Sequence, residues 1–358
     1  MSPFIGQDLA QISCPTTRYF RDVPGVAVRS FLVERTFGSE PNLKKGLPMI
    51  DFTGQVVIVT GAGRGLGRLY ALDLAQRGAS VVVNDVGGTM AGEGSDSSVA
   101  DEVVKEITGQ GGIAVASHDS VDSAEGGAAI VDRAMEEFGR LDAVVSNAGI
   151  FDTLPFDELP AENWLRMLNV HLNGSFYLSQ PAYRVMKDQG GGRFVFIASS
   201  AGLFGQPNSA HYAAAKAGIV GLANVIAIDG VAHGILANTV LPFGYSRMVT
   251  ETVGDRDELG DAVPFLRAIE PELVVPMVVY LASRACTFTH QNYSACAGRF
   301  ARVFVGLGEG WGASPGTPPT AEAIEAHLAE VSATEPFIVP DSIFDEVTQI
   351  CSQLGIPL

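Results

Sequence analysis

The sequence predicts an α/β fold built on a doubly wound parallel sheet, and three observations support that prediction. Short apolar runs rich in β-branched residues alternate with longer helical stretches, as they do where helices cover both faces of a parallel sheet. Hydrophobic residues make up 47% of the chain and charged residues only 18%, so we expect a sizeable buried core. The length of 358 residues allows one large domain with additions or two smaller domains.

The regular part of the chain begins with Val56-Val57-Ile58-Val59-Thr60, a continuous β-branched run typical of a strand that is covered on both faces. A glycine-rich turn follows, and Gly78 ends the helix after it. Further strands are expected at residues 81–83, 114–116, 143–145, 194–197 and 236–240. Helices are expected at residues 68–77, 98–108, 125–138, 160–187, 210–232 and 321–331, the last one capped by Thr320.

Composition divides the chain into three parts. Residues 1–48 hold six Lys and Arg against four acids, whereas the remaining 310 residues carry a formal charge of −19, so we expect an N-terminal extension. Met49 precedes the first strand and could equally be the natural start. Residues 49–305 form the expected single domain. Residues 306–358 begin rich in Gly and Pro, and they predict a linker and tail that packs on the core or on a partner subunit.

Charge and cysteine content exclude several classes of protein. The net charge of −17 argues against nucleic acid as a partner, because such binding needs Lys and Arg to neutralise phosphates. No secretory signal and no membrane span of ~18 apolar residues is expected. The scattered cysteines lack metal-site spacing, so we expect no metal and a reduced, cytoplasmic compartment. These cysteines are Cys14, Cys286, Cys296 and Cys351.

The turn after the first strand, Thr60-Gly61-Ala62-Gly63-Arg64-Gly65-Leu66-Gly67, has the pattern of a dinucleotide-binding loop. Gly61 permits the tight turn, and Gly65 and Gly67 lack the Cβ atoms that would keep the backbone away from a pyrophosphate. A glycine-rich string alone often marks only a turn. Here the preceding strand, the following helix and a suitably placed acid agree, so we expect this loop, with Arg64 and Leu66, to bind a dinucleotide on a Rossmann-like sheet.

That acid is Asp85, which stands 20 residues beyond Gly65 and just after the second strand. A carboxylate there accepts hydrogen bonds from ribose hydroxyls and repels a 2′-phosphate, which favours NAD over NADP. Two observations leave alternatives open: Asp85 also suits an ordinary strand-end turn, and Arg64 could accept a 2′-phosphate. We predict NAD as the cofactor.

Three polar residues form a candidate catalytic group. Tyr212 and Lys216 are four residues apart, so they share one face of the expected helix. A phenol with a pKa of ~10 is a poor base at neutral pH, and a neighbouring ammonium lowers that pKa. Ser199 ends the strand at 194–197, at the sheet edge where ligands bind in open α/β folds. The alternative is a surface Tyr and Lys on an Ala-rich helix.

Together with Asn147-Ala148-Gly149, these motifs resemble the short-chain dehydrogenase/reductase family in order and spacing, over about residues 50–300. The resemblance implies that Tyr212 is the general acid/base, that Lys216 lowers its pKa and holds the nicotinamide ribose, and that Ser199 binds the reacting oxygen. It also implies cofactor contacts from Asp119, Ser120, Asn147, Ala148, Gly149, Tyr212, Lys216 and Pro242. Helices of this family pair across subunits, so a homodimer or homotetramer is expected.

A closer resemblance is to the (3R)-hydroxyacyl-CoA dehydrogenase domains of multifunctional enzymes type 2 and their bacterial relatives. It rests on stretches that include Asn84-Asp85-Val86-Gly87-Gly88 and His171-Leu172-Asn173-Gly174-Ser175-Phe176. It implies a 3-hydroxyacyl-CoA-type substrate, for whose phosphates Arg247 and Arg267 are the nearest cations. The apolar lid expected at 244–271 suits a hydroxysteroid or another bulky hydrophobic alcohol equally well. The non-enzyme alternative is a silent dinucleotide-sensing scaffold, which the presence of the Tyr and the Lys disfavours.

His171 stands where many members of the family carry a catalytic Asn. It could relay protons through water, since its ordinary pKa is ~6.5. It could also be a structural histidine that donates a hydrogen bond to a backbone carbonyl. Both interpretations are open at the level of the sequence.

Overall fold

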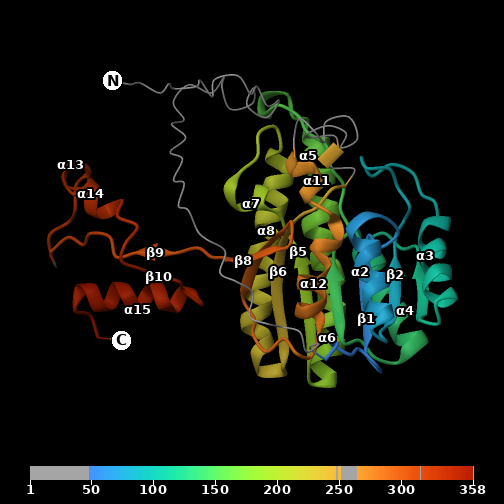
Figure 1. The fold of residues 1–358 in the computed structure, drawn as a ribbon. Helices are drawn as coiled ribbons and strands as arrows, with labels where there is room; N and C mark the ends of the chain where they lie inside the picture. The colour runs from blue at the N-terminus through green and yellow to red at the C-terminus, as the bar shows by residue number, and fades with distance from the viewer. Residues whose placement is uncertain (1–47, 247–248, 251–263, 315, 358) are drawn as a thin grey trace, which may run out of the picture.

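The chain is described from a computed structural model, and the description takes in residues 48–246, 249–250, 264–314 and 316–357. At its centre lies an eight-stranded sheet in the order β3-β2-β1-β4-β5-β6-β7-β8 (Figure 1). Strands β1 to β7 run parallel, and β8 is antiparallel to β7. The strands are β1 Val56–Thr60, β2 Ser80–Asn84, β3 Ile113–Ser117, β4 Ala143–Ser146, β5 Gly192–Ile197, β6 Ile235–Phe243, β7 Gln291–Cys296 and β8 Arg299–Val303. The predicted doubly wound, mostly parallel fold is confirmed.

Helices cover both faces of this sheet, and β1 shows why its sequence is a continuous apolar run. Every residue of β1 is buried. Val57 and Val59 pack into the cluster formed with α2, α3 and α12, whereas Val56 and Ile58 pack into the cluster formed with α4, α6 and α8. The helices are α2 Gly65–Gln76, α3 Ser98–Gly109, α4 Ala124–Phe138, α5 Ala161–Leu168, α6 Gly174–Gln189, α7 Ser200–Phe204, α8 Ala210–Gly230, α11 Pro264–Ala268 and α12 Val275–Ala282.

Within the domain at 49–305, two of the predicted helices differ from their predicted bounds by more than two residues. α2 begins at Gly65, three residues earlier than expected, because glycine has a low helix propensity and hides the first turn in the sequence. The single helix expected at 160–187 is observed as α5, a π-helical turn at Asn169–Asn173, and α6. Such a turn inserts an extra residue into the hydrogen-bond ladder and occurs often at functional sites.

The last two strands of the sheet were not predicted. Five of the six residues of β7 are only partly buried, and its sequence, Gln-Asn-Tyr-Ser-Ala-Cys, contains no apolar run. β8 is an antiparallel edge strand whose residues alternate between partly buried and exposed over most of its length. A search for continuous apolar runs finds buried central strands, so it misses strands of this kind.

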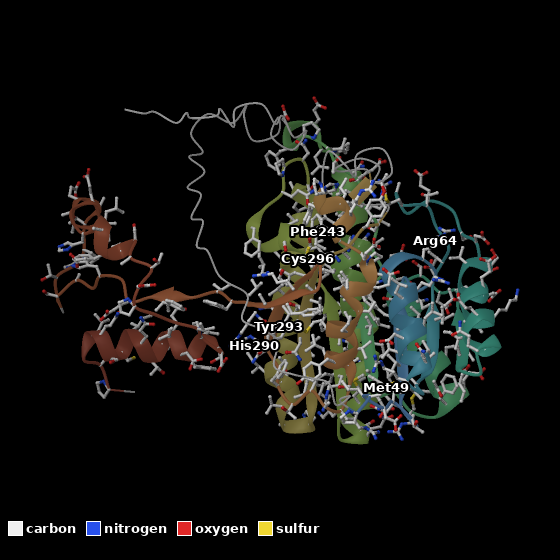
Figure 2. All side chains as sticks on the ribbon, in the orientation of Figure 1. Met49, Arg64, Phe243, His290, Tyr293 and Cys296 are labelled. Atoms are coloured by element: carbon white, nitrogen blue, oxygen red, sulfur yellow. The ribbon has the colours of Figure 1, made fainter. Side chains whose placement is uncertain are left out.

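The sheet has a functional edge and an opposite edge. Arg64 follows β1 and Phe243 ends β6, so both lie at the carboxyl edge of the parallel strands, whereas Met49 lies at the other edge (Figure 2).

One helix among the described residues is long and apolar enough to cross a membrane, although the sequence predicted none. It is Ala210–His233, which consists of α8 and the turn after it. It packs on β6 and carries the buried Lys216, as a core helix does.

The tail from residue 306 onward stands apart from the sheet in Figure 1, and none of its described residues is buried. Its elements are β9 Leu307–Gly308, α13 Ala321–Ala326, α14 Leu328–Val331, β10 Phe337–Ile338 and α15 Ile343–Leu354. Thr320 caps α13 as predicted, by accepting a hydrogen bond from Ala323 N at 3.2 Å. The helix expected at 321–331 is divided in two, and α15 was not predicted. The described tail contacts the core domain at two points: the Phe337 ring stacks on Phe304 with centres 5.7 Å apart, and Asp341 lies 3.9 Å from His290. Its packing on the core or on a partner subunit stays a prediction. Most of the expected extension, residues 1–47, lies outside the described residues.

Candidate active site

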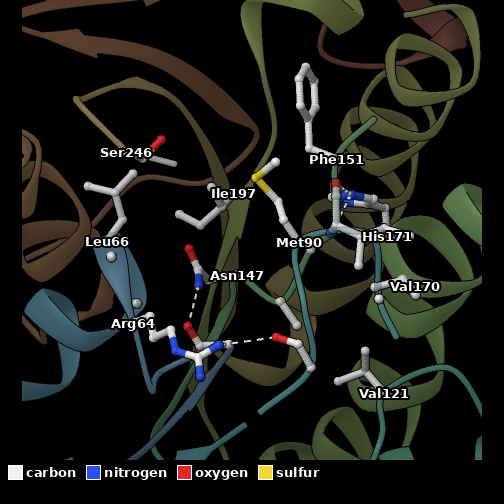
Figure 3. A pocket seen from close by; sticks show the side chains of 18 of the residues that line it. Arg64, Leu66, Met90, Val121, Asn147, Phe151, Val170, His171, Ile197 and Ser246 are labelled. Carbon is white, nitrogen blue, oxygen red and sulfur yellow. Dashed lines mark hydrogen bonds between the residues drawn. The ribbon is translucent and has the colours of Figure 1, made fainter. Parts of the chain in front are cut away.

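A cavity of about 460 Å³ opens at the carboxyl edge of the sheet, where loops after β1, β2, β3, β4, β5 and β6 meet α8. Every residue that the sequence analysis proposed for catalysis or cofactor binding lines this cavity. They are Gly61, Arg64, Gly65, Leu66, Gly67, Asp85, Asp119, Ser120, Asn147, Ala148, Gly149, Ser199, Tyr212, Lys216 and Pro242. Figure 3 shows Arg64 and Leu66 on one side of the pocket and Phe151 and His171 on the other. The fold therefore gathers residues that lie up to 181 positions apart in the chain, from Gly61 to Pro242.

The glycine-rich turn has the shape that close approach of a phosphate group requires. Gly61 and Gly65 have φ angles of +61° and +54°, in the left-handed region that favours glycine. A Cβ atom on Gly67 would lie 2.1 Å from Gly61 O, so the turn has no room for a side chain there. Gly65 has no described atom within 4 Å of the Cβ position and borders the cavity, so its backbone is open to a ligand. These residues fit a dinucleotide pyrophosphate.

Asn147, after β4, holds this turn in place. Its side-chain Nδ2 donates to Thr60 O at 2.9 Å and to Gly61 O at 3.1 Å. The backbone N–H groups of Asn147 and Ala148 both donate to Thr60 Oγ1 at 3.0 Å. Strands β1 and β4 are thereby joined at the base of the cavity, and Asn147 shapes the turn through its own hydrogen bonds.

Asp85 lies at the same end of the cavity as Arg64. Its two carboxylate oxygens accept hydrogen bonds from Gly63 N at 2.9 Å and from Gly87 N at 2.7 Å, which fixes the carboxylate beside the glycine-rich turn. Arg64 Nη1 donates to Gly88 O at 3.1 Å. Asp119 accepts at its backbone oxygen from Asn84 Nδ2 at 2.8 Å, which orders the loop after β3. The carboxylate and the cation thus both border the place where an adenosine ribose would lie.

The candidate catalytic residues lie close together at the other end of the cavity from Asp85 and Arg64. Tyr212 and Lys216 are 8% and 3% exposed, so the alternative of a surface Tyr and Lys is wrong. Ser199 caps α7 by accepting from Ala201 N at 3.2 Å, and it also forms a hydrogen bond with Tyr212. Lys216 Nζ donates to Ile197 O at 2.7 Å and lies 5.6 Å from the centre of the Tyr212 ring. Two hydroxyl groups therefore meet at the cavity wall, with an amine buried beside them.

The pKa of Tyr212 differs in direction from the sequence expectation. Burial raises the pKa of this phenol, and the hydrogen bond with Ser199 lowers it only in part. Burial lowers the pKa of Lys216 to about 7, so this amine titrates close to neutral pH. A neutral amine cannot stabilise a phenolate by charge, so only the protonated form of Lys216 can lower the pKa of Tyr212.

His171 lies in the π-helical turn and is buried against Tyr212, with the two ring centres 5.3 Å apart in an edge-on arrangement. Its Nε2 lies 2.8 Å from Ile150 O, which is the backbone carbonyl contact that the structural interpretation predicted. Burial, followed by the charge of Lys216, lowers the pKa of His171 well below its ordinary value, so the ring is neutral at pH 7. A Cβ on Gly149 would lie 2.4 Å from His171 Cε1, so this ring also requires the glycine.

The substrate end of the cavity is apolar. Met90, Ile150, Phe151, Phe243 and Val249 line it. Of the two cations considered for CoA phosphates, Arg247 lies outside the described residues, and Arg267 is not among the residues that line the cavity. Much of the expected lid, including residues 251–263, also lies outside the described part of the chain.

A glycine cradle for a dinucleotide and a Ser–Tyr–Lys group in one cavity define a nicotinamide-dependent oxidoreductase of the α/β class. Residues 55–257 match the family model described as short chain dehydrogenase. The chain belongs to this family, whose members are NAD(P)-dependent oxidoreductases that act on CH–OH groups.

Individual relatives agree with this assignment. The chain is 42% identical over 278 residues to a short-chain type dehydrogenase/reductase of Mycobacterium tuberculosis, which covers 78% of this chain and 94% of that protein. It is 46% identical over 237 residues to the mouse peroxisomal multifunctional enzyme type 2, covering 66% of this chain but only 31% of the mouse enzyme. The solved structure of the full-length Drosophila melanogaster enzyme of that name has a TM-score of 0.69 and 30% identity, covering 86% of this chain and 50% of that one.

Proposed function

We propose that the protein interconverts a secondary alcohol and a ketone with NAD, on a substrate of the 3-hydroxyacyl-CoA type. The observation that carries the proposal is the meeting of Ser199, Tyr212 and Lys216 with the glycine cradle in one cavity. The substrate class is supported by the similarity to multifunctional enzymes type 2, whereas the apolar walls beyond Tyr212 suit an acyl chain and a hydroxysteroid alike. Membership of an oxidoreductase family disfavours a silent scaffold.

The side chains divide the chemistry between them. The hydrogen-bonded hydroxyls of Ser199 and Tyr212 can hold one substrate oxygen between them. Tyr212 takes the hydroxyl proton when the alcohol is oxidised and returns it when the ketone is reduced. Lys216 favours the phenolate when it is protonated, and it would hold the nicotinamide ribose. When bound, the nicotinamide supplies the hydride acceptor or donor.

NAD is the proposed cofactor because the Asp85 carboxylate is fixed by two backbone N–H groups beside the cradle. A fixed negative charge accepts ribose hydroxyl groups and repels a 2′-phosphate. Arg64 is held to Gly88 O, so part of its hydrogen-bonding capacity is already used by the protein.

The experiment that tests the substrate class is a comparison of kcat/KM for three alcohols with NAD⁺ and with NADP⁺. They are a 3-hydroxyacyl-CoA, the same acyl group on truncated pantetheine, and a hydroxysteroid. We expect the CoA ester to be turned over best, with NAD⁺. Equal turnover of the truncated ester would show that CoA itself is not recognised, and preference for the steroid would favour the alternative substrate.

We also propose a homodimer or homotetramer in which the tail packs on a partner. Exposed apolar residues on α6 and α8, Phe176, Val225 and Ile228, suit helix pairing, and the tail exposes Ile343 and Phe344. The structural match to the Drosophila enzyme covers 86% of this chain, which is a larger share than the domain at residues 49–305 makes up. Sedimentation of the full chain and of a chain ending at residue 305 tests this, because a tail that packs on a partner should strengthen assembly. A cytoplasmic location and the absence of nucleic-acid and membrane partners stay predictions.

A further inference from the structure

A polar cluster around one buried histidine lies beside the cavity without lining it, and sequence reasoning missed it. It consists of Asp152, in the loop after β4, Asn163 and Arg166 on α5, and His211 in the first turn of α8. His211 is fully buried and directly precedes Tyr212 in the chain. We call these four residues the Asp152 cluster.

Asp152 is the centre of the cluster. Its Oδ1 accepts a hydrogen bond from His211 Nε2, and its Oδ2 accepts from Asn163 Nδ2 at 3.0 Å and from Arg166 Nη2 at 3.1 Å. Burial raises the pKa of Asp152, but the hydrogen bonds from His211 and Asn163 and the neighbouring charges outweigh it, and the pKa is lowered overall. An ionised carboxylate only accepts hydrogen bonds, so Nε2 of His211 must carry the proton that it donates.

The cluster is joined to Tyr212 through the start of α8. Ser209, at the N-cap of that helix, makes no capping hydrogen bond with its side chain, so the first turn lacks the usual local anchor. Leu154 N donates to Asn208 O at 2.8 Å, which ties the loop of Asp152 to the segment just before α8. The bond between Asp152 and His211 then fixes the first turn itself.

The same loop and helix also hold the Tyr212 ring. Phe151, next to Asp152, meets that ring edge-on with centres 5.1 Å apart. Met167, next to Arg166 on α5, is fully buried in the same apolar group as Tyr212. Asp152 and Arg166 are therefore each adjacent in the chain to a residue that packs near the Tyr212 ring.

We infer that Asp152 and His211 are positioning residues for catalysis, which hold the first turn of α8 so that the Tyr212 hydroxyl meets Ser199. This inference rests on the proposed role of Tyr212 as the acid/base. Catalysis by a positioned group is sensitive to small displacements, since a shift of about 1 Å can cost about 10²-fold in rate. A hydrogen-bonded pair with fixed geometry limits such displacement more than apolar packing does.

The first test measures His211→Ala and Asp152→Asn against wild type. We expect kcat to fall about 10-fold to 100-fold while the Kd for NADH, measured by fluorescence titration, stays within about 2-fold. His211→Gln, which keeps an N–H donor toward Asp152, should recover part of the lost kcat. The matched control is His118→Ala, because His118 also precedes a proposed site residue and contacts Asp101 at 3.0 Å, but on the surface. We expect this control to leave kcat unchanged.

The second test separates positioning from a general structural role by a double-mutant cycle. If His211 acts through Tyr212, then His211→Ala should cost no further activity in a Tyr212→Phe background. An equal fold-loss in both backgrounds, or an unchanged kcat in His211→Ala, would overturn the inference. If His211→Ala does not fold, the same cycle is run with His211→Gln. Full activity of Tyr212→Phe alone would instead overturn the proposed function, so the two failures are distinguishable.

Discussion

The cofactor end of the cavity is built mainly from backbone, whereas the catalytic end is built from buried ionisable side chains. At the cofactor end the key positions are glycines, and the polar side chains there are tied to main-chain atoms, as Asn147 is to Gly61 O. At the catalytic end, Tyr212 and Lys216 are buried and their pKa values are shifted. We therefore expect substitutions at the first end to change cofactor binding and substitutions at the second to change rate and pH dependence.

The largest effect on binding is expected for Gly67→Ala. The new Cβ would lie 2.1 Å from Gly61 O, so the turn that receives the pyrophosphate must move. We expect the Kd for NADH to rise about 100-fold or more, which is about 2.7 kcal/mol. NADH fluorescence titration measures this. Gly109→Ala is the control, because no described atom outside its chain neighbours and its own helix backbone lies within 4 Å of its Cβ position. NADH binding by Gly67→Ala within 3-fold of wild type would contradict the account.

Lys216 should give the catalytic end a distinctive dependence of stability on pH. Its native pKa is about 7 against an ordinary 10.5, so between these values the unfolded chain holds a proton that the native chain lacks. Stability then rises with pH, by up to about 1.4 kcal/mol per unit for one proton. Urea unfolding at pH 7, 8 and 9 should show this slope in wild type and a smaller slope in Lys216→Met. The exposed Lys187→Met is the control, and equal slopes in wild type and Lys216→Met would refute the prediction.

A smaller effect is expected for Asp85→Ala. Removing the carboxylate takes away an acceptor for ribose hydroxyls and a charge that repels a 2′-phosphate. We expect the ratio of kcat/KM for NAD⁺ over NADP⁺ to fall about 10-fold, equal to about 1.4 kcal/mol. Steady-state kinetics with both cofactors measures the ratio. An unchanged ratio would remove Asp85 from the selection of the cofactor.

The sequence predicted the central strands well, and it named residues that the fold brings together in one cavity, because both depend on local patterns. β1 is apolar at four of its five positions since both its faces are covered, and the glycine-rich turn follows it directly. β7 could not be found in the same way, because it is partly buried and mixes polar and apolar residues. The tail helix α15 exposes most of its apolar residues, and none of the described residues covers this apolar face.

The Asp152 cluster was missed for a different physical reason. Asp152 and His211 are 59 residues apart, and no spacing rule joins a loop after one strand to the first turn of a helix that follows the next strand. The pKa of Tyr212 was also given the wrong direction, because the sequence shows that Lys216 is near but not that both groups are buried. Contacts between residues far apart in the chain, and the burial of ionisable groups, can be seen only in the three-dimensional structure.

The central claim is that Tyr212 moves the proton while the glycine cradle binds the cofactor. Single-turnover hydride transfer by Tyr212→Phe, with NADH binding titrated on the same sample, tests it most directly. We predict a rate lower by about 10²-fold or more, the scale expected when a general acid/base is removed, with an unchanged Kd for NADH. A rate close to that of wild type would contradict the claim.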